Sequence, residues 1–188
     1  MESILKPIIV DEEIKLTQFT LSDAKILFEL TDKNREYLRK WLPWLDEIKT
    51  EADTAQKFIQ NSLNGALQGK AADFGIYYKK VLVGAIGYHN IDNKNKKTTI
   101  GYWVDQDHQG IKIATRATGG LIDYAFKVIK LNRVQINCAT GNKKSSAIPN
   151  KLKFQIEGIS REAEWLYDRF VDWEQYSLLS SEWNKLMV

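Results

Sequence analysis

The segment from Thr98 to Tyr124 constrains the fold more than any other part of the chain, because its pattern changes from strand to helix across a short polar loop. The segment from Thr99 to Val104 has the alternation of a strand, in which Ile100, Tyr102 and Val104 alternate with Thr99, Gly101 and Trp103. Further on, apolar residues recur every three or four positions and share one helical face; they are Ala114, Ala117, Leu121, Tyr124 and Val128. A helix starting there points its free N–H groups and the positive end of its dipole into the crevice beyond the strand. The segment therefore predicts an anion site that suits a pyrophosphate.

The rest of the chain predicts a mixed α/β fold. Alternating patterns predict further strands over 14–20, 74–78, 81–91, 134–138, 155–160 and 172–179. Helical spacing and capping signals predict helices after Ser22-Asp23 and over 34–41, 53–67 and 145–152. The helix that follows residue 112 makes one parallel crossover, and the strands around Lys79-Lys80 form an antiparallel hairpin.

Composition narrows the class of protein. The chain has 188 residues, 44% of them hydrophobic, which suffices for one core but not for two ordinary domains, so we expect one domain over 1–188. Cys138 is the only cysteine, which excludes an intrachain disulfide. No apolar run approaches the length of a membrane span, and we expect a soluble, cytoplasmic protein with no membrane partner. The net charge of +3 weakly favours anionic ligands, and without a recognisable module we expect no direct nucleic-acid partner.

Several motifs resemble one family. His108-Gln109-Gly110, followed by Ala114-Thr115-Arg116-Ala117, resembles the pyrophosphate loop of the GNAT superfamily of N-acetyltransferases, whose pattern is Arg/Gln-x-x-Gly-x-Gly/Ala. Further stretches resemble its ribosomal-protein N-terminal (serine/alanine) acetyltransferase branch: Gly101-Tyr102-Trp103, Leu131-Asn132-Arg133-Val134, Asn142-x-x-Ser145 and Arg161-Glu162-Ala163-Glu164. The resemblance implies a GNAT fold of class α/β, with a mixed central sheet of about six to seven strands, splayed central parallel strands and flanking helices. It also implies acetyl-CoA as co-substrate and no metal.

The same resemblance assigns residues to the acetyl-CoA site. Main-chain groups of Trp103 and Val104 would polarise the thioester, the loop would hold the pyrophosphate, and Asn142 would contact the pantetheine arm. The implied set is Trp103, Val104, Gln109, Gly110, Ile111, Lys112, Ile113, Ala114, Thr115, Asn142 and Ser145. Lys112 departs from the family pattern, which has glycine there. Its ammonium would add a cationic contact, or its side chain would crowd phosphates that glycine lets approach the backbone; both interpretations stay open.

Catalytic roles come from the resemblance as well. Ser145 takes the role of general acid toward the thiolate, and Glu164 takes the role of general base toward the amine. Alternatives remain, because Asn and Ser are favoured helix N-caps and a charged residue between strands is often a solvated turn residue. His89 and His108 are rival bases, since imidazole titrates near neutral pH. The position of Cys138 in an alternating strand favours a buried small side chain over a nucleophile.

The acceptor side is less defined. The resemblance implies an acceptor groove lined by Trp41 and Trp44, although packing in the core explains these residues equally well, and His89 lies in a strand that would edge the cleft. The aromatic residues of the 165–176 stretch fit either a homodimer contact or the core. Our first hypothesis is direct transfer of acetyl from acetyl-CoA to a primary amine, in the first place the α-amino group of a protein such as a ribosomal protein. The alternatives are a small-amine acetyltransferase and a non-catalytic acyl-CoA-binding or ribosome-associated binding protein.

Overall fold

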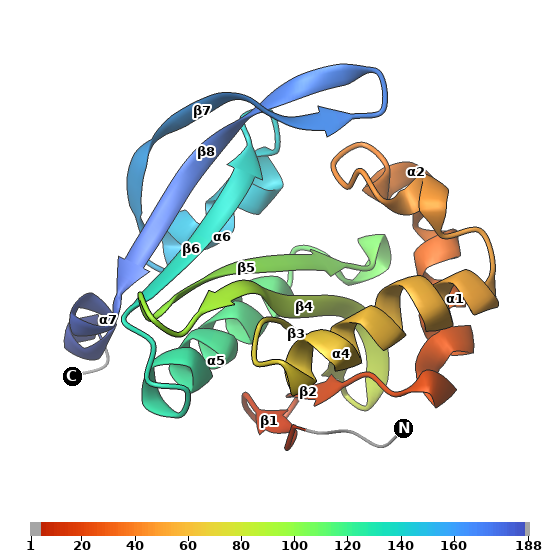
Figure 1. Cartoon of the computed structure of the whole chain (residues 1–188), viewed down its shortest axis with the longest axis horizontal. Helices are drawn as coiled ribbons and strands as arrows, with labels where there is room; N and C mark the ends of the chain where they lie inside the picture. The colour runs from red at the N-terminus through yellow and green to blue at the C-terminus, as the bar shows by residue number, and fades with distance from the viewer. Residues whose placement is uncertain (1–4, 187–188) are drawn as a thin grey trace.

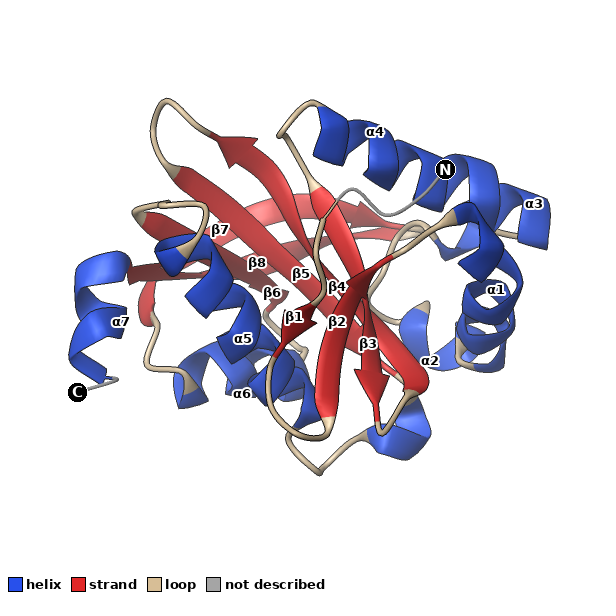
Figure 2. Ribbon diagram, turned by 90° about the horizontal axis from the view of Figure 1, so that it is seen from below, coloured by secondary structure: helices blue, strands red, loops and turns tan. Residues whose placement is uncertain are grey.

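One twisted sheet organises the molecule, seen from two directions in Figures 1 and 2. The computed structural model describes residues 5–186. Within these residues the sheet has eight strands in the order β1-β2-β3-β4-β5-β6-β8-β7. The strands are β1 (Ile8–Ile9), β2 (Ile14–Gln18), β3 (Ala72–Tyr78), β4 (Val81–Asp92), β5 (Lys97–Val104), β6 (Arg133–Ala139), β7 (Gln155–Leu166) and β8 (Arg169–Leu179).

Helices cover both faces of the sheet. The α-helices are α1 (Ala24–Lys33), α2 (Arg35–Leu38), α3 (Glu51–Asp53), α4 (Asn61–Leu67), α5 (Ile113–Lys127), α6 (Lys143–Lys151) and α7 (Ser180–Leu186). Short 3₁₀ segments are η1 (Leu21–Asp23), η2 (Leu45–Glu47) and η4 (Gln106–His108), and a π-helical segment, η3 (Thr54–Gln60), joins α3 to α4. No helix within the described residues is long and apolar enough to cross a membrane.

The core lies on two sides of the sheet. On one side, α5 buries Ala117 and Leu121 completely against the strands. On the other side, α1 and the η3–α4 helix pack Leu27, Ile59 and Leu63 against β4. Burying an aliphatic side chain of this kind stabilises the fold by about 1.5–3 kcal/mol.

The sheet opens in its middle, which is the feature that positions a site. β5 and β6 are its parallel pair, and their register covers only Lys97↔Arg133, Thr98↔Val134 and Thr99↔Gln135. Beyond that point the strands diverge, as Figure 1 shows. We call this point the fork. The splayed parallel strands expected from the sequence are thus confirmed, and the main-chain groups of β5 beyond Thr99 do not pair with β6.

The expected elements are mostly confirmed, with differences at their ends. The eighth strand comes from the two-residue β1, which is too short to give a sequence pattern. The C-terminal hairpin is longer than the expected 155–160 and 172–179, because its two β-bulges interrupt the alternation. The helix expected over 34–41 is reduced to the single turn of α2. Val128 was expected on the buried face of α5 but is 59% exposed, because α5 ends at Lys127.

Candidate active site

A cavity of about 490 Å³ lies beside the fork. The end of β5, the loop before α5, the first turn of α5, α6 and the α2 segment form its walls. Most of the cofactor-binding residues expected from the sequence line it: Trp103, Val104, Gln109, Gly110, Lys112, Ile113, Ala114, Thr115, Asn142 and Ser145. Ile111 lies outside this lining and is half exposed.

The first turn of α5 forms one wall of the cavity. The Arg116 N–H bonds to the Lys112 carbonyl oxygen at 2.9 Å as the helix begins, so the amides of residues 113–115 precede the ladder of intrahelical bonds. Gly110 has φ +82° and Lys112 has φ +65°, which turn the chain sharply into the helix. The left-handed conformation explains why glycine suits position 112, and here a lysine adopts it at a steric cost of about 1–2 kcal/mol.

A buried carboxylate holds the loop before α5 in place. Asp105 accepts hydrogen bonds from Asn34 Nδ2 at 2.9 Å, His108 Nδ1 at 2.8 Å and Lys33 Nζ at 3.1 Å. Burial by itself would raise the pKa of Asp105, but these hydrogen bonds outweigh it and lower that pKa. The imidazole of His108 is thereby tied to the scaffold, and His108 also lines the cavity. Sequence reasoning missed Asp105, because Lys33 and Asn34 lie some 70 residues earlier in the chain, at the end of α1 and directly after it.

A chain of side chains crosses the cavity from α2 to α6. Gln109 Nε2 donates to the Tyr37 hydroxyl, and Lys144 Nζ donates to Gln109 Oε1 at 3.0 Å. Tyr37, Lys144 and Lys151 line the cavity although sequence reasoning did not single them out. Lys112, Lys144 and Lys151 all line the cavity, and their three positive charges favour an anion there.

Ser145 lies on the cavity wall beside two other polar side chains. The Tyr102 hydroxyl donates to the Ser145 carbonyl oxygen at 3.0 Å and lies 3.4 Å from Ser145 Oγ, which is also 3.3 Å from Cys138 Sγ. Asn142 Oδ1 accepts the Ser145 N–H at 3.1 Å, so Asn142 is the N-cap of α6. Burial raises the pKa of the Cys138 thiol, and the residue is 2% exposed, as expected for a small core side chain.

Glu164 lies in strand β7, paired with Val171, and not in the turn of the hairpin. It does not line the cavity described above. The carboxylate is half-buried, and this burial raises its pKa, while a hydrogen bond with Trp173 partly opposes the shift. A raised pKa is what a carboxylate needs to take up a proton near neutral pH.

The β7–β8 hairpin reaches back to the α2 segment, as Figure 1 shows. The Tyr167 hydroxyl donates to the Leu42 carbonyl oxygen at 2.6 Å, and the Arg39 guanidinium lies 3.9 Å from the centre of the Tyr167 ring. Leu42 also lines the cavity. The hairpin that carries Glu164 is therefore tied to the cavity wall.

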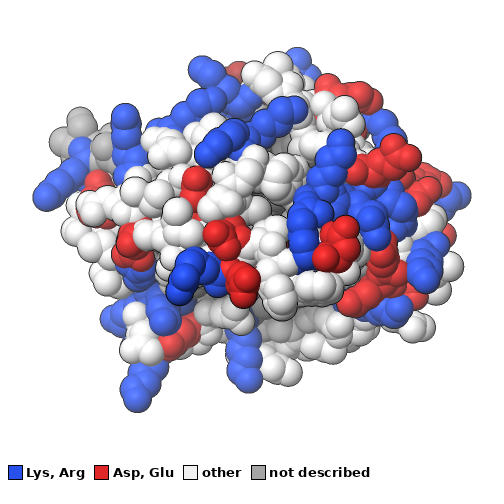
Figure 3. All heavy atoms as spheres, turned by 90° about the horizontal axis from the view of Figure 1, so that it is seen from above, with Lys and Arg blue, Asp and Glu red and all other residues white. Residues whose placement is uncertain are grey.

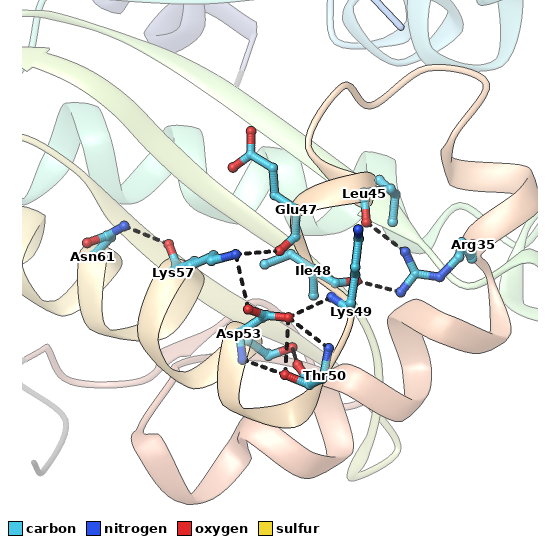
Figure 4. A network of polar contacts seen from close by, with 10 residues as sticks. Arg35, Leu45, Glu47, Ile48, Lys49, Thr50, Asp53, Lys57 and Asn61 are labelled. Carbon is cyan, nitrogen blue, oxygen red and sulfur yellow. Dashed lines mark hydrogen bonds and ion pairs between the residues drawn. The ribbon is translucent and has the colours of Figure 1, made fainter.

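Polar contacts fix the segment that follows Trp41 and Leu42 in the chain, and Figure 4 shows the residues that make them. Arg35 donates to the carbonyl oxygens of Leu45 and Ile48, each at 2.6 Å. Thr50 and Asp53 form a capping box at the start of α3, and backbone hydrogen bonding by Lys49 is the largest cause that lowers the pKa of Asp53 to about 2. The segment between α2 and α3 is thus fixed by polar contacts although it contains no long helix.

The three residues expected at the acceptor groove lie in different places. Trp41 lines the cavity, and its ring lies 3.3 Å from where a Cβ on Gly141 would be. Trp44 packs against Phe58 with ring centroids 6.0 Å apart and lies outside the cavity lining. His89 is exposed on β4, opposite Thr99. Among the described residues, no group of three His, Cys, Asp or Glu side chains could hold a metal ion.

Comparison with known proteins agrees with this geometry. Residues 13–155 match the acetyltransferase (GNAT) domain family. The ribosomal-protein-serine acetyltransferase of Escherichia coli (strain K12) is 32% identical over 168 residues, covering 89% of this chain and 93% of that protein. YdaF of Bacillus subtilis (strain 168), whose name assigns it provisionally to the ribosomal N-acetyltransferases, is 37% identical over 181 residues, covering 93% and 95%. The crystal structure of the microcin C7 self-immunity acetyltransferase MccE with acetyl-CoA and AMP has a TM-score of 0.86 and 32% identity, covering 90% and 94%.

Proposed function

The chain belongs to the GNAT family and is an acyltransferase that uses acetyl-CoA, and we propose that its acceptor is the α-amino group of a protein, in the first place a ribosomal protein. The similarity to a ribosomal-protein-serine acetyltransferase over nine-tenths of the chain supports this acceptor. The cytoplasm is the location where such an enzyme would meet its substrates, and we keep it as part of the proposal.

The cavity residues fit acetyl-CoA. The first turn of α5 offers unpaired amides to a diphosphate, and Lys112, Lys144 and Lys151 add positive charge on the same cavity. We assign the pyrophosphate to the loop of residues 109–115, with Ile111 supporting it through its backbone rather than its side chain. Main-chain groups of Trp103 and Val104 take the thioester, and Asn142 borders the pantetheine arm. Acetyl-CoA supplies the acetyl group as an activated thioester.

Two side chains carry the proton transfers in this proposal. Glu164 removes a proton from the acceptor ammonium, which leaves the amine lone pair free to attack. Ser145, whose Oγ lies 3.4 Å from the Tyr102 hydroxyl, donates a proton to the departing thiolate. Trp41 lines the acceptor end, and His89 contacts the acceptor from β4. Trp44 supports this end from behind, through Phe58.

Replacing Ser145 with alanine is expected to lower kcat by about 10- to 100-fold, because the thiolate then leaves without a proton donor. Binding of acetyl-CoA, measured by calorimetry, should change little, since the serine acts only as the bond breaks. The matched control is Ser146→Ala, which removes the hydroxyl of the buried neighbour. Equal kcat in Ser145→Ala and the wild type would remove the acid role.

Replacing Lys112 with glycine separates the two interpretations of this position. The left-handed backbone becomes unstrained, so the free energy of unfolding should stay the same or rise by up to about 1 kcal/mol. We expect acetyl-CoA to bind several-fold more weakly, because Lys112 is exposed at the cavity and its ammonium contributes to phosphate attraction. Lys112→Met keeps the stem without the charge as a control. Tighter binding by the glycine variant would show that the lysine obstructs the site.

The acceptor is tested directly with purified protein, acetyl-CoA and three kinds of amine. We expect CoA release and a single acetyl group, located by mass spectrometry, on peptides with free serine or alanine N-termini. Peptides blocked at the N-terminus but containing lysine should stay unmodified. Faster turnover of small amines would favour the small-amine alternative. Binding of acetyl-CoA without turnover of any amine would contradict the proposal.

Other partners stay predictions. Trp165 and Phe170 form an exposed cross-strand pair with ring centroids 4.8 Å apart, whereas Tyr176 belongs to the core. We therefore expect a homodimer contact to involve Trp165 and Phe170. Sedimentation of the wild type and of Trp165→Ser tests this. Figure 3 shows basic and acidic side chains interleaved over one face, which does not favour nucleic acid as a partner there.

A further inference from the structure

The side chain of Asn34 is directed away from the helix that it precedes. Asn34 lies between α1 and α2 and occupies the N-cap position of α2, where asparagine is a favoured residue. Its side chain nevertheless makes no capping hydrogen bond there. The residue is only 3% exposed, and a buried amide needs hydrogen-bond partners. These partners must therefore come from another part of the fold.

The partners of this amide lie where β5 ends. Asn34 Nδ2 donates to Asp105 Oδ1 at 2.9 Å, and Asn34 Oδ1 accepts the Gln106 N–H at 2.9 Å. The Leu30 carbonyl oxygen accepts a further hydrogen bond from Nδ2 at 2.9 Å. Both polar atoms of the amide are thus paired. One buried side chain fixes the first two residues of the loop that leads from β5 to α5.

The two partners make opposite demands, which an amide meets in one side chain. Burial opposes ionisation of Asp105, but its hydrogen bonds, with that from Asn34 the largest of them, lower its pKa and keep it a carboxylate. A carboxylate accepts hydrogen bonds, whereas the Gln106 N–H donates one. Alanine at position 34 would leave both groups without this partner, at a cost in free energy because the site is buried.

Neighbouring residues of the same segment contact the loop in the same order. Lys33 Nζ lies 3.1 Å from Asp105 Oδ2 and 2.7 Å from Asp107 Oδ2. Further along the chain, the Tyr37 hydroxyl accepts a hydrogen bond from Gln109 Nε2. We call the segment from Lys33 to Tyr37 the α1–α2 junction. Its contacts follow the loop from the end of β5 to the lining of the cavity.

The two parts of the proposed acetyl-CoA site are held by different means. Trp103 and Val104 are paired with β4 within the sheet. The loop after them lies outside the sheet, and Gly110, with φ +82°, allows its backbone more conformations than another residue would. The position of the loop therefore depends on its side-chain contacts with the α1–α2 junction.

We propose that Asn34 is a positioning residue for acetyl-CoA binding, which holds the loop in the geometry that presents residues 109–115 to the diphosphate. This inference rests on the function proposed above and on its acetyl-CoA site. Asn34 does not line the cavity, so it acts through Asp105 and the main chain of Gln106. The loop is ordered before the ligand arrives, and binding does not have to bear the entropy cost of ordering it.

Asn34→Ala is the first test, measured by calorimetric titration. We expect acetyl-CoA to bind at least about tenfold more weakly than to the wild type, because the loop must then be ordered on binding. S-acetylpantetheine, which presents the thioester without the diphosphate, should bind as it does to the wild type. Equal acetyl-CoA affinity in Asn34→Ala and the wild type would overturn the inference.

Asp107→Asn is the matched control in the same loop. Asp107 contacts the same lysine as Asp105, but its side chain is 69% exposed, and an exposed ion pair contributes little to stability. We expect this variant to bind both thioesters like the wild type. A loss of acetyl-CoA affinity as large as that of Asn34→Ala would show that the effect does not depend on the buried amide.

The ratio of the two affinities separates positioning from stability. Unfolded molecules bind neither thioester, so partial unfolding leaves the ratio of the two dissociation constants unchanged. An equal loss of affinity for both compounds in Asn34→Ala would therefore contradict the positioning role. Asp105→Asn keeps an oxygen for the Asn34 amide but removes the charge, and we expect the same selective loss to be smaller in this second variant.

Hydrogen exchange gives a measurement that needs no ligand. The amides of residues 106–112 should exchange faster in Asn34→Ala than in the wild type, because the loop opens more often. The amides of residues 117–125 in α5 should keep their wild-type rates. Wild-type rates at residues 106–112, or a uniform increase throughout the chain, would contradict a role confined to the loop.

The outcomes distinguish this inference from the proposed function. A wild-type protein that acetylates no amine shows that the proposed function fails, and equal wild-type affinity for both thioesters shows that the proposed diphosphate site fails. A wild-type protein that acetylates peptides and prefers acetyl-CoA, together with an Asn34→Ala variant of the same preference, leaves the function standing and refutes only the role of Asn34.

Discussion

Replacing Glu164 with glutamine is expected to lower kcat/KM for an acceptor peptide by about 10²- to 10³-fold, because glutamine cannot take the proton from the acceptor ammonium. Acetyl-CoA affinity should be unchanged, since Glu164 does not line the cavity described above. Steady-state kinetics together with calorimetry separates the two quantities. Glu162→Gln, an exposed neighbour in the same strand, is the matched control and should retain wild-type kinetics.

The pH dependence follows from the direction of the pKa shift. Burial raises the pKa of Glu164 above its ordinary value of 4.5. The base acts as the carboxylate, so activity falls as the pH drops through this raised pKa, and the acidic limb lies above pH 4.5. Glu164→Gln should lack this limb. A variant that keeps the wild-type limb and rate would show that another group is the base.

The stability of Glu164→Gln tests whether unfolding is the cause of its loss of activity. Because the pKa is higher in the folded than in the unfolded state, ionisation of Glu164 disfavours folding at pH values above both. Glutamine removes this cost, so Glu164→Gln should be at least as stable as the wild type at neutral pH. A clear fall in its melting temperature would contradict a carboxylate whose burial outweighs its hydrogen bond with Trp173.

Replacing Ala114 with glutamate is expected to weaken acetyl-CoA binding by at least about 100-fold, because it places a carboxylate among the amides that face the pyrophosphate. Ala114 lines the cavity in the first turn of α5. An acidic side chain in that turn interacts favourably with the helix dipole, so the melting temperature should not fall. The measurement is calorimetric titration with acetyl-CoA.

Ala114→Gln is the control for size. Its side chain has nearly the same volume as glutamate but no charge, so it reports the steric part of the effect alone. We expect it to retain most of the affinity. If both variants bind acetyl-CoA as tightly as the wild type, the ligand does not contact the start of α5.

The strand–loop–helix segment could be predicted from sequence because its information is local. The spacing of apolar residues changes from that of a strand to that of a helix at residues 104–113, and Ala117 and Leu121 share one helical face. Both features can be recognised from neighbouring residues alone. By contrast, the network at Asp105 and the contact of Tyr167 with Leu42 join residues far apart in the chain. Neither leaves a pattern in one sequence, and so Tyr37 and Lys144 were missed at the cavity.

The acceptor side was hardest to predict for the same reason. Whether a tryptophan lines a groove depends on how a loop folds back, and the structure places Trp41 at the cavity but Trp44 against Phe58. The raised pKa of Glu164 depends on its burial in the β7–β8 hairpin. The two β-bulges of this hairpin interrupt the alternation that would otherwise show the length of its strands in the sequence.

The central claim is that the start of α5 holds the diphosphate of acetyl-CoA, and calorimetric titration of the wild-type protein with two thioesters tests it most directly. Acetyl-CoA carries the diphosphate, whereas S-acetylpantetheine presents the same thioester without it. We predict saturable one-to-one binding of acetyl-CoA in the micromolar range and much weaker binding of S-acetylpantetheine. Equal affinity for both compounds, or no heat with acetyl-CoA at high micromolar concentration, would contradict the account.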